Sequence, residues 1–579
     1  MAIQKPNPPS EVFAVVVSMR RIFLAAGAFS FFVNGLMLVP SIYMMQVYDR
    51  VLASRNETTL MMITLITLGL YVLLGFVEWV RAQLLVRAGV QLDEQLNNRV
   101  FTASFQAALK GAGGNPAQAL SDLTNVRQFL TGNGLFAFFD APWAPIYLIV
   151  ITLLHPLLGL LSFVGAVLLV GLTFLTEKAT LKPLTEANAV AIQANSFAGN
   201  SLRNAEVIEA MGMLPYLRER WYAKHRRSLA LQQLASDRAG AISATTRFVR
   251  ISLQSLILGA GALLAIEDKV SAGAMIAGSI LMGRMLSPVE QAIGIWKNLA
   301  AVRSAYERLN KLLTAFPARA VGMTLPPPKG QVSVENLTVT APNSQAIILK
   351  GVNVAFAPGE VIGIVGPSAS GKSTLARLLV GIWPAAGGKV RLDGADIYEW
   401  NKLEVGRHIG YLPQDVELFD GSVAENIARF SAIDSDTVVR AAERAGIHEM
   451  ILRLPRGYDS PIGASGGFLS AGQRQRVALA RAIYDNPALI VLDEPNSNLD
   501  DAGEMALMKA VVDLKARGST IVVITHRTSI LSVVDKLLLL REGTVQLFGP
   551  RAEVLAALAK ANAAALAVTA KPASIASAG

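Results

Sequence analysis

Six long apolar runs lie in the first half of the chain. They cover approximately residues 22–45, 60–80, 135–154, 157–175, 241–266 and 273–292. Each run is close to the roughly 20 residues that a helix needs to cross the hydrocarbon core of a bilayer. Polar residues interrupt some of the runs, so buried helices of a large core are the alternative. Because the polar, motif-rich sequence is confined to the second half of the chain, the pattern favours six membrane spans.

The segments that connect these runs predict how the spans are oriented. Basic residues are abundant at Arg20 and Arg21 and in the long segments 81–134 and 177–247. The short loops expected at 49–57, 155–156 and 267–271 carry little net positive charge. Because positively charged loops stay on the cytoplasmic side, both termini and the whole second half are expected in the cytosol. The first run is long enough to remain as an anchor, and no cleavable signal peptide is expected before it.

The string GPSASGKS at 366–373 has the spacing of glycine, lysine and hydroxyl groups that surrounds nucleotide phosphates. Its glycines let the loop fold tightly, Lys372 can reach the β and γ phosphate oxygens, and Ser373 can hold Mg²⁺. The apolar stretch VIGIVG before the loop predicts a buried strand, and STLARLLVGI predicts a helix that begins at the phosphates. A chance match in a Gly/Ser-rich turn is the alternative, which the flanking strand and helix disfavour. The sequence therefore predicts a site for ATP or GTP.

Two further segments narrow the chemistry. The apolar strand ALIVLDEP, 488–495, ends in Asp493, which suits the Mg²⁺ shell, and Glu494, which suits the polarisation of an attacking water. A carboxylate pair that only caps the strand end is the alternative. The segment LSAGQRQRVALARA, 469–482, begins a helix at a turn of small residues, whose free N–H groups form a second anion site. Two phosphate-binding surfaces on one chain suggest that two chains share two nucleotides.

These motifs, in this order, make residues 330–554 similar to the nucleotide-binding domain of an ATP-binding-cassette (ABC) transporter. The resemblance implies an α-helical six-span transmembrane domain with the ABC exporter fold. An α/β P-loop ATPase domain with a mainly parallel sheet and a helical subdomain would follow it. The expected segments are a cytosolic N-terminal segment (1–20), the transmembrane domain (21–315), a Pro-rich linker (316–330), the nucleotide-binding domain (331–555) and an Ala-rich, disordered tail (556–579).

The resemblance also implies roles for individual residues. ATP would be bound by the phosphate loop, the signature turn and the loop that crosses the dimer seam, through Gly366, Ser368, Ser370, Gly371, Lys372, Ser373, Thr374, Ser470, Gly472, Gln473 and Asp500. The Mg²⁺ ligands would be Ser373, Gln414 and Asp493. The catalytic group would consist of Glu494 as the base, His526 at the γ-phosphate, and Gln414, which senses Mg²⁺ and couples to the membrane domain. For His526 taken alone, an ordinary histidine at the end of a strand is the alternative.

Two positions depart from the family pattern. Ala471 stands where the signature turn usually has a second glycine; its methyl group would lie near the partner's phosphate, and it restricts φ. Thr340 and Ala341 stand where an aromatic ring usually stacks on adenine. We therefore expect an effect on turnover and a different means of holding the base.

Four longer strings of sequence indicate one group within the ABC transporter family. They are MMQVYDRVLASRNETTL (44–60), FFDAPWAPIYL (138–148), PQDVELFDGSVAENIARF (413–430) and LDEPNSNLD (492–500). Together they resemble the type I protein-secretion transporters, in the branch that exports metalloproteases, lipases and related proteins with an uncleaved C-terminal signal. The resemblance implies that the chain lies in the inner membrane, works as a homodimer and exports an unfolded polypeptide. It also implies ATP and Mg²⁺ as cofactors, and a periplasmic adaptor and an outer-membrane channel as partners.

The same likeness concerns the two long cytosolic segments. The regions 121–130 and 201–213 would contain or flank short helices that dock on the nucleotide-binding domain. A plain amphipathic hairpin is the alternative that periodicity leaves open.

Composition supports a membrane protein and disfavours nucleic-acid binding and cleavage of a leader peptide. Hydrophobic residues make up 52% of the chain and charged residues 17%, with a mean hydropathy of +0.42, beyond what a soluble two-domain protein normally has. The net charge of +10 is a topology signal with some attraction to anionic lipid headgroups, and no basic stripe with interleaved aromatics indicates nucleic-acid binding. The chain has no cysteine, whereas related exporters that trim a leader peptide use a cysteine protease. Export without cleavage is therefore expected.

Two other functions stay open at this point. An ABC exporter of lipids, drugs or short peptides would carry the same ATPase motifs, and a wide apolar cavity open to lipid would favour it. A membrane-anchored ATPase that regulates a partner would close with ATP without moving cargo.

Overall fold

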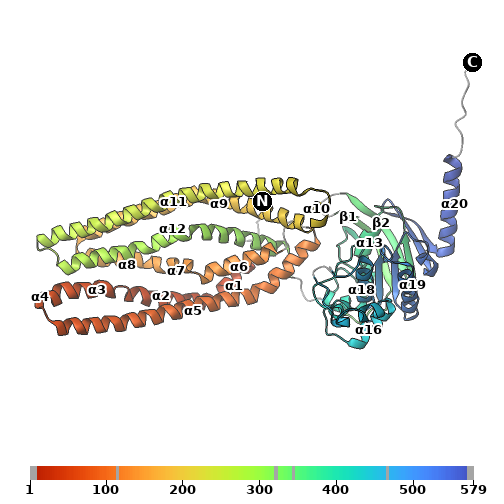
Figure 1. Cartoon of the computed structure of the whole chain (residues 1–579), viewed down its shortest axis with the longest axis horizontal. Coiled ribbons are helices and arrows are strands. Elements are labelled where there is room, and N and C mark those ends of the chain that lie inside the picture. The colour runs from red at the N-terminus through yellow and green to blue at the C-terminus, as the bar shows by residue number, and fades with distance from the viewer. Residues whose placement is uncertain (1–9, 112–116, 319–323, 342–345, 464–467, 570–579) are drawn as a thin grey trace, which may run out of the picture. The chain divides into compact units, whose positions relative to one another are not determined.

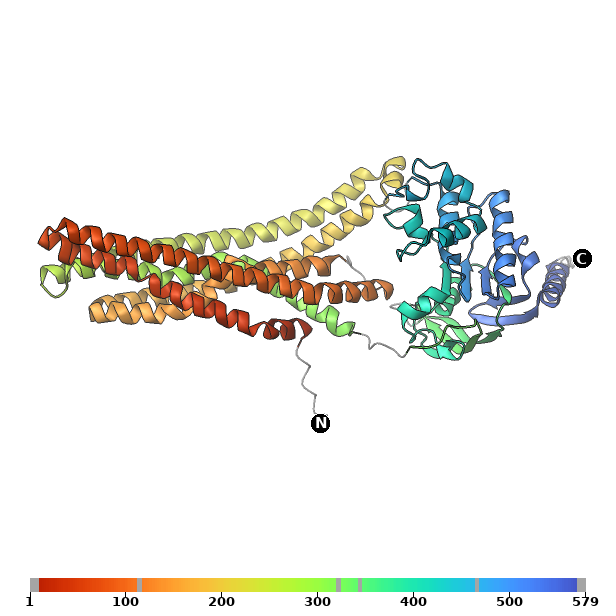
Figure 2. The ribbon, with the colours of Figure 1, turned by 90° about the horizontal axis from the view of Figure 1, so that it is seen from below.

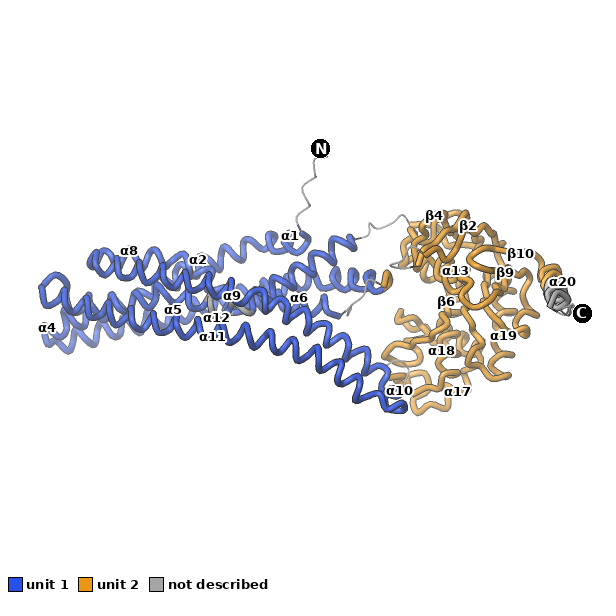
Figure 3. The backbone as a smooth tube through the Cα atoms, turned by 90° about the horizontal axis from the view of Figure 1, so that it is seen from above, with its two compact units in different colours: residues 1–108, 112–318 blue, residues 109–111, 319–579 orange. Residues whose placement is uncertain are grey.

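The computed structural model describes residues 10–111, 117–318, 324–341, 346–463 and 468–569 (Figure 1). The chain forms two compact units, which are residues 1–108 with 112–318 and residues 109–111 with 319–579 (Figure 3). Throughout its described residues the first unit is helical, and the second combines helices with two sheets.

Long helices that run alongside one another build the first unit (Figures 1 and 2). They are α1 (Glu11–Ser18), α2 (Arg20–Leu36), α3 (Val39–Gln46), the π-helical turn η1 (Val47–Val51), α4 (Leu52–Ser54), α5 (Glu57–Leu109), α6 (Gln118–Thr131), α7 (Asn133–Asp140), the 3₁₀ turn η2 (Ala141–Trp143), α8 (Ala144–Leu154), α9 (Pro156–Leu202), α10 (Ala205–Ala210), α11 (Leu214–Ile266) and α12 (Ala272–Ala315). Helices α5 and α11 have 53 residues each. At 1.5 Å per residue they measure about 80 Å, far more than the roughly 30 Å hydrocarbon layer, so both extend well beyond it.

Six helical segments of the described chain are long and apolar enough to cross a membrane. They are Arg20–Ser54, Glu57–Leu109, Gly134–Leu154, Pro156–Leu202, Leu214–Ile266 and Ala272–Gln291. Large apolar side chains such as Val72, Leu153 and Ile266 are exposed on them, which suits a surface that faces lipid. The six-span membrane domain predicted from the apolar runs is confirmed.

The connection after the first span differs from the expected loop at 49–57. Turns η1 and α4 continue the helix to Ser54, and the chain reverses at Arg55, which has φ 49°. Asp49 holds this segment in its helical conformation beside α12. Its carboxylate accepts hydrogen bonds from the Ser271 hydroxyl at 2.6 Å and the Gly273 N–H at 2.8 Å. The string that begins at Met44 thus joins the C-terminal end of the first span to the start of α12.

Two large apolar clusters, beside a small one of Leu184, Ala235 and Ala300, hold the described part of the first unit together. One joins α8, α9, α11 and α12 through Tyr147, Ile151, Leu169, Ile257 and Met282. The other joins α1, α5, α6 and α12 through Val12, Leu92, Val100, Leu123 and Leu309. Helix α12 takes part in both clusters and so links the spans to the helix ends beyond them.

The second unit contains two sheets. Their strands are β1 (Val332–Thr340), β2 (Ile347–Phe356), β3 (Val361–Val365), β4 (Gly387–Leu392), β5 (Ala395–Asp396), β6 (Ile409–Leu412), β7 (Leu489–Asp493), β8 (Thr520–Ile524), β9 (Lys536–Arg541) and β10 (Thr544–Pro550). The larger sheet has the order β10-β9-β3-β8-β7-β6, parallel except for β10, and the smaller antiparallel sheet has the order β2-β1-β4-β5. The mainly parallel sheet expected for the ATPase domain is confirmed.

Helices cover the larger sheet and complete the second unit. They are α13 (Lys372–Leu379), α14 (Lys402–Val405), η3 (Gly406–His408), α15 (Val423–Ile427), α16 (Ser435–Arg444), α17 (His448–Leu452), η4 (Gly457–Asp459), α18 (Ala471–Ile483), α19 (Asp501–Ala516), η6 (Ile530–Val533) and α20 (Arg551–Thr569). Strand β7 is buried on both faces: Ile490 and Leu492 join the cluster with α15 to α19, and Leu489 and Val491 join the cluster with the smaller sheet and α13. This double burial explains why the strand is a continuous apolar run.

Helix α20 includes part of the tail that was expected to be disordered from residue 556. The chain stays helical to Thr569 because it is rich in alanine, the residue with the highest helix propensity, and has no Gly or Pro between 551 and 569. Residues 570–579 of the expected tail lie outside the described residues.

Candidate nucleotide-binding and hydrolysis site

Three neighbouring parallel strands end where the predicted catalytic residues begin. Gln414 follows β6, Glu494 follows β7 and His526 follows β8. Because the carboxyl ends of neighbouring parallel strands lie at one edge of the sheet, these side chains meet there. The Gln414 Nε2 group donates a hydrogen bond to Glu494 Oε2 at 3.2 Å, and His526 Nε2 lies 3.5 Å from Glu494 Oε1. The structure thus brings together three residues that are far apart in the chain.

Glu494 is held in an uncommon backbone conformation. Its φ of 49° lies in the left-handed region, which non-glycine residues seldom adopt. The backbone N–H of Glu494 donates to the carbonyl of Ile524 at 2.9 Å, and its own carbonyl accepts from Gln475 Nε2 at 3.2 Å. Strained residues fixed by their surroundings in this way cluster at functional sites.

The phosphate loop connects β3, in the middle of the larger sheet, to the start of α13. Gly371, directly before the helix, has φ 98°, and a Cβ at this position would lie 2.8 Å from Leu349 Cδ2. At Gly366 a Cβ would lie 2.1 Å from the carbonyl oxygen of Leu540. Only glycine fits both positions, so the close packing of this loop explains the spacing seen in the sequence.

Lys372 is buried beneath this loop. Its Nζ donates to the carbonyls of Gly366 at 2.9 Å and Pro367 at 2.8 Å. Burial lowers the pKa of Lys372 below its ordinary value, against the opposing effect of the carboxylates of Glu494 and Asp493. The Lys372 ammonium group donates to neutral carbonyls, so phosphate oxygens would be stronger acceptors for it, and the backbone N–H groups of the loop can bind the same phosphate.

The other loop residues assigned to the nucleotide take different positions. Ser370 Oγ is buried without a hydrogen-bond partner. Ser368 is exposed and Thr374 is buried on the first turn of α13. A phosphate oxygen would satisfy the unpaired Ser370 hydroxyl, so the loop fits the group for which it was predicted.

Among the predicted Mg²⁺ ligands Ser373, Gln414 and Asp493, only Asp493 has a carboxylate, and this group is buried. In the part of the chain that the structure describes, no cluster of three or more His, Cys, Asp and Glu side chains could hold a metal ion alone. Asp493 is 2% exposed and its Oδ1 has no hydrogen-bond partner. Burial raises the pKa of Asp493 above its ordinary 3.8, and a hydrogen bond with Ser373 opposes this shift. Since Mg²⁺ in nucleotide sites is bound by one or two carboxylates together with phosphate oxygens, this arrangement fits it.

The signature turn forms a separate structure at the start of α18. The Ser470 hydroxyl accepts from the Gln473 N–H at 3.2 Å, and Gln473 Oε1 accepts from the Ser470 N–H at 2.9 Å. A Cβ at Gly472 would lie 2.8 Å from the carbonyl of Asn498. Ala471 is the first helical residue and does not require a positive φ, so alanine fits this backbone without strain. The hydrogen bonds of the turn thus stay within it and none joins it to the phosphate loop, among the described residues.

Asp500, predicted to lie at the dimer seam, is the N-cap of α19. Its Oδ1 accepts from the Gly503 N–H at 2.9 Å. At the position expected to hold adenine, Thr340 is the last residue of β1, and the Ala341 N–H donates to the Ala346 carbonyl at 2.9 Å. Residues 342–345, between Ala341 and Ala346, lie outside the described residues.

Gln475 is a further residue beside the predicted base, and the sequence motifs do not single it out. Its side chain is buried, and its Nε2 donates to the carbonyl of Pro495 at 2.6 Å as well as to that of Glu494. Its Oε1 accepts from the Asn498 N–H at 3.0 Å. Gln475 therefore ties the signature helix to the segment that carries the predicted base. The available signal was a glutamine at a helix position whose neighbours one turn away, Ala478 and Leu479, are apolar.

Comparisons with known proteins agree with the fold of both units. Residues 23–289 match the family model described as the ABC transporter transmembrane region, and residues 349–497 match the one described as ABC transporter. A solved bacterial Atm1-family ABC exporter with ATP bound has the same fold, with a TM-score of 0.79, 21% identity and coverage of 93% of this chain and 96% of that one. The fold and the site thus define an ABC transporter, whose ATP-binding domain couples ATP hydrolysis to transport.

Two curated relatives narrow the class. The type I secretion system ATP-binding protein PrsD of Rhizobium meliloti (strain 1021) is 45% identical over 544 residues, 94% of each chain. The toxin RTX-I translocation ATP-binding protein of Actinobacillus pleuropneumoniae is 29% identical over 93% of this chain and 77% of its own length. The chain belongs to the type I secretion family of ABC transporters, which confirms the family predicted from its sequence.

Asp493→Asn is expected to raise the thermal stability of the nucleotide-free protein and to abolish the added stabilisation by Mg²⁺ with ATP. The substitution removes a buried charge whose unsatisfied oxygen costs on the order of 1–3 kcal/mol. Thermal unfolding would be followed with ATP in the presence of Mg²⁺ or of a chelator. Asp436→Asn, at an exposed carboxylate of the same unit, is the control. A Mg²⁺-dependent shift that survives in Asp493→Asn would contradict the assignment.

Proposed function

We propose that this protein is the inner-membrane ATPase of a type I secretion system, which works as a homodimer and exports unfolded polypeptides with an uncleaved C-terminal signal. A periplasmic adaptor and an outer-membrane channel would complete the route across two membranes. Both termini and the nucleotide-binding unit would lie in the cytosol, as the basic connecting segments indicate. The observation that carries the proposal is the end-to-end similarity to PrsD, 45% identity over 94% of both chains.

The proposed cycle uses the site residues in three roles. Lys372 would exchange the carbonyls of Gly366 and Pro367 for phosphate oxygens, and Ser470 of the other copy would close over the γ-phosphate. Glu494 would accept the proton of the attacking water, and its pairing with His526, which would lie at the γ-phosphate, would keep the base in place. Bound Mg²⁺, held by Ser373, Gln414 and Asp493, would neutralise charge on the phosphates. Because ATP would touch both copies only in the closed form, it would shift the population toward that form.

A cavity with charged groups in the membrane unit supports a polypeptide cargo over lipids or hydrophobic drugs. The cavity has a volume of about 510 Å³ and a mixed lining, with the polar side chains Asn34, Glu78, Arg81, Asp140, Arg284 and Gln291 beside apolar and aromatic ones such as Val33, Met37, Phe136 and Ile295. Arg81 pairs with Asp140 at 3.2 Å, so charged groups of both signs are kept among the spans. Sites for apolar small molecules are lined mainly by hydrophobic and aromatic side chains. Polar groups of both signs suit a peptide backbone with charged side chains better.

ATPase measurements in lipid nanodiscs test the proposal. C-terminal segments of candidate secreted proteins are expected to change the rate in a saturable way, whereas scrambled segments, lipids and hydrophobic drugs are not. Lys372→Ala is expected to remove the activity in every condition, which shows that the measured rate belongs to this site. A response to lipids or drugs alone would favour the small-substrate exporter. ATP-driven closure without cargo uptake into sealed proteoliposomes would favour a regulatory ATPase.

A further inference from the structure

Glu504 lies at the junction of two segments that carry predicted catalytic residues. It is in the first turn of α19, and its side chain is 14% exposed. One segment, 494–500, runs from the predicted base to the start of this helix. The other, 525–529, contains His526. The carboxylate of Glu504 contacts both segments.

On the first segment the contact is made through Asn496. This residue is 3% exposed, and its Nδ2 donates to Glu504 Oε1 at 3.2 Å. The other end of the same amide reaches the second segment, because Asn496 Oδ1 accepts from the Thr525 hydroxyl at 3.4 Å. Asn496 stands two residues after Glu494, so it fixes the backbone that presents the base.

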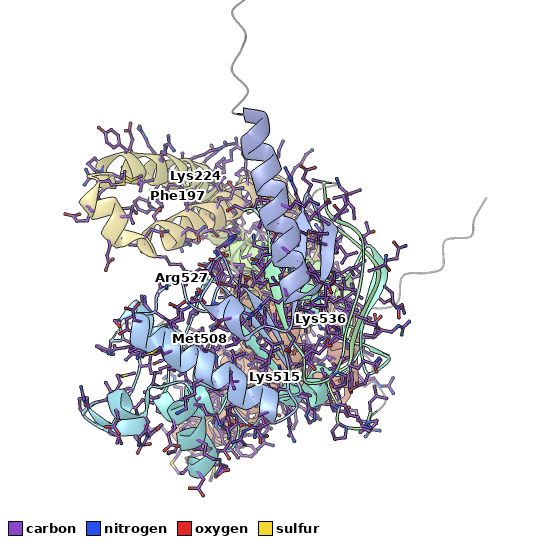
Figure 4. All side chains as sticks on the ribbon, turned by 90° about the vertical axis from the view of Figure 1, so that its right-hand side faces the viewer. Phe197, Lys224, Met508, Lys515, Arg527 and Lys536 are labelled. Carbon is purple, nitrogen blue, oxygen red and sulfur yellow. The ribbon has the colours of Figure 1, made fainter. Side chains whose placement is uncertain are left out.

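On the second segment the contacts lie on both sides of His526. The Ser529 hydroxyl donates to Glu504 Oε1, and Arg527 Nη1 lies 3.6 Å from Glu504 Oε2. The Arg527 N–H also donates to the Thr525 hydroxyl at 3.1 Å. Figure 4 shows Arg527 beside the N-terminal end of α19, the helix that carries Met508 and Lys515 further along.

Capping of α19 does not account for these contacts. Asp500 already caps the helix through the Gly503 N–H, and Asp501 supplies a second negative charge in the first turn. Glu504 instead directs its oxygens to side chains outside its own helix. Hydrogen bonds from Ser529 and Asn496 lower the pKa of Glu504 below its ordinary value, so the group is a charged acceptor at neutral pH.

We propose that Glu504 is a positioning residue for ATP hydrolysis, which holds the Glu494 segment and the His526 segment in register. Its polar partners among the described residues do not include Glu494 or His526, so its effect passes through Asn496, Ser529 and Arg527. The result is the 3.5 Å separation between Glu494 Oε1 and His526 Nε2. Loss of this register would misplace the attacking water relative to the γ-phosphate, because errors of about 1 Å at a reacting group cost on the order of 10²-fold in rate.

The first test compares Glu504→Gln with Asp501→Asn in the full-length protein in nanodiscs. Glutamine keeps the size of the side chain, and its one oxygen can still accept from Ser529 and Asn496. It lacks the negative charge that strengthens these hydrogen bonds, and its NH2 group cannot pair with Arg527. Loss of a charged hydrogen bond of this kind is expected to lower kcat about tenfold, with the KM for ATP within about twofold of the wild type. Asp501→Asn removes the same charge from the same helix turn without touching the network, and it is expected to keep the wild-type kcat.

A purely structural role would give a different result. It would lower the melting temperature together with kcat or raise the KM, and either pattern would overturn the proposal, as would a wild-type kcat in Glu504→Gln. The second test adds Ser529→Ala, alone and combined with Glu504→Leu, which has no acceptor for the Ser529 hydroxyl. If both residues act through one contact, the double variant is expected to be no slower than Glu504→Leu alone; additive losses would overturn the proposal. Since these rates are basal ATPase rates, the outcome does not depend on the identity of the cargo.

Discussion

Glu494→Gln is expected to lower the rate of ATP hydrolysis by about 10²- to 10⁴-fold, the contribution of a general base. Glutamine has the size of glutamate and can still accept from Gln414 Nε2, so the contact at 3.2 Å and the local backbone are preserved. What it lacks is a carboxylate that can accept the proton of the attacking water. ATP binding is therefore expected to persist while turnover stops, which would trap the closed dimer with ATP bound.

The measurement is the ATPase rate together with the oligomeric state after incubation with Mg²⁺ and ATP. Glu417→Gln removes an exposed carboxylate of the same unit and is expected to match the wild type in both. Turnover at the wild-type rate, or monomers only in the presence of ATP, would show that Glu494 is not the base of a shared site.

Arg81→Ala is expected to destabilise the membrane unit by about 3–5 kcal/mol, the usual cost of leaving one partner of a buried ion pair without the other. The side chains of Arg81 and Asp140 are 8% and 17% exposed, and their charged atoms lie 3.2 Å apart. Arg81 also donates to Ser30 Oγ at 3.1 Å and lies over the Phe136 ring at 4.1 Å from its centroid. Removal of the guanidinium would leave Asp140 with the Asn34 amide, at 2.7 Å, as its remaining hydrogen-bond donor.

Thermal unfolding in nanodiscs checks this prediction, with two matched variants. Arg227→Ala breaks the ion pair with Glu186, whose side chains are 67% and 43% exposed, and is expected to change stability by less than about 1 kcal/mol. Arg81→Met with Asp140→Leu removes both buried charges and is expected to recover most of the loss. Equal effects of Arg81→Ala and Arg227→Ala would contradict a buried, mutually dependent pair.

The Arg81–Asp140 pair also explains part of the string FFDAPWAPIYL, 138–148. Proline with tryptophan is common at the ends of membrane helices, so only the whole string resembles the type I secretion transporters. Asp140 forms an ion pair with Arg81 of α5, and Trp143 packs on Phe31 of α2 with ring centroids 4.9 Å apart. Its partners lie on α2 and α5, so no local pattern could have predicted the contact.

Gln475 and Glu504 show the same limit in the nucleotide-binding unit. Each looks ordinary in the sequence, since a glutamine in a helix and a glutamate in a first helical turn are common. Their importance arises from partners brought close by the sheet: the carbonyls of Glu494 and Pro495 for Gln475, and Ser529 for Glu504. Side-chain hydrogen bonds between segments far apart in the chain leave no periodic signal.

The sequence alone determined the properties that depend on local composition and spacing. Apolar length specified six spans, because a bilayer requires about 20 apolar residues per helix. The loop around Lys372 specified a phosphate site, because backbone N–H groups can converge only where glycine permits it. Only the tertiary structure decided which distant groups meet. The parallel order of β6, β7 and β8 places Gln414, Glu494 and His526 at one edge, and helix packing buries Arg81 against Asp140. Those pairings follow from how the elements pack, which residue spacing along the chain does not encode.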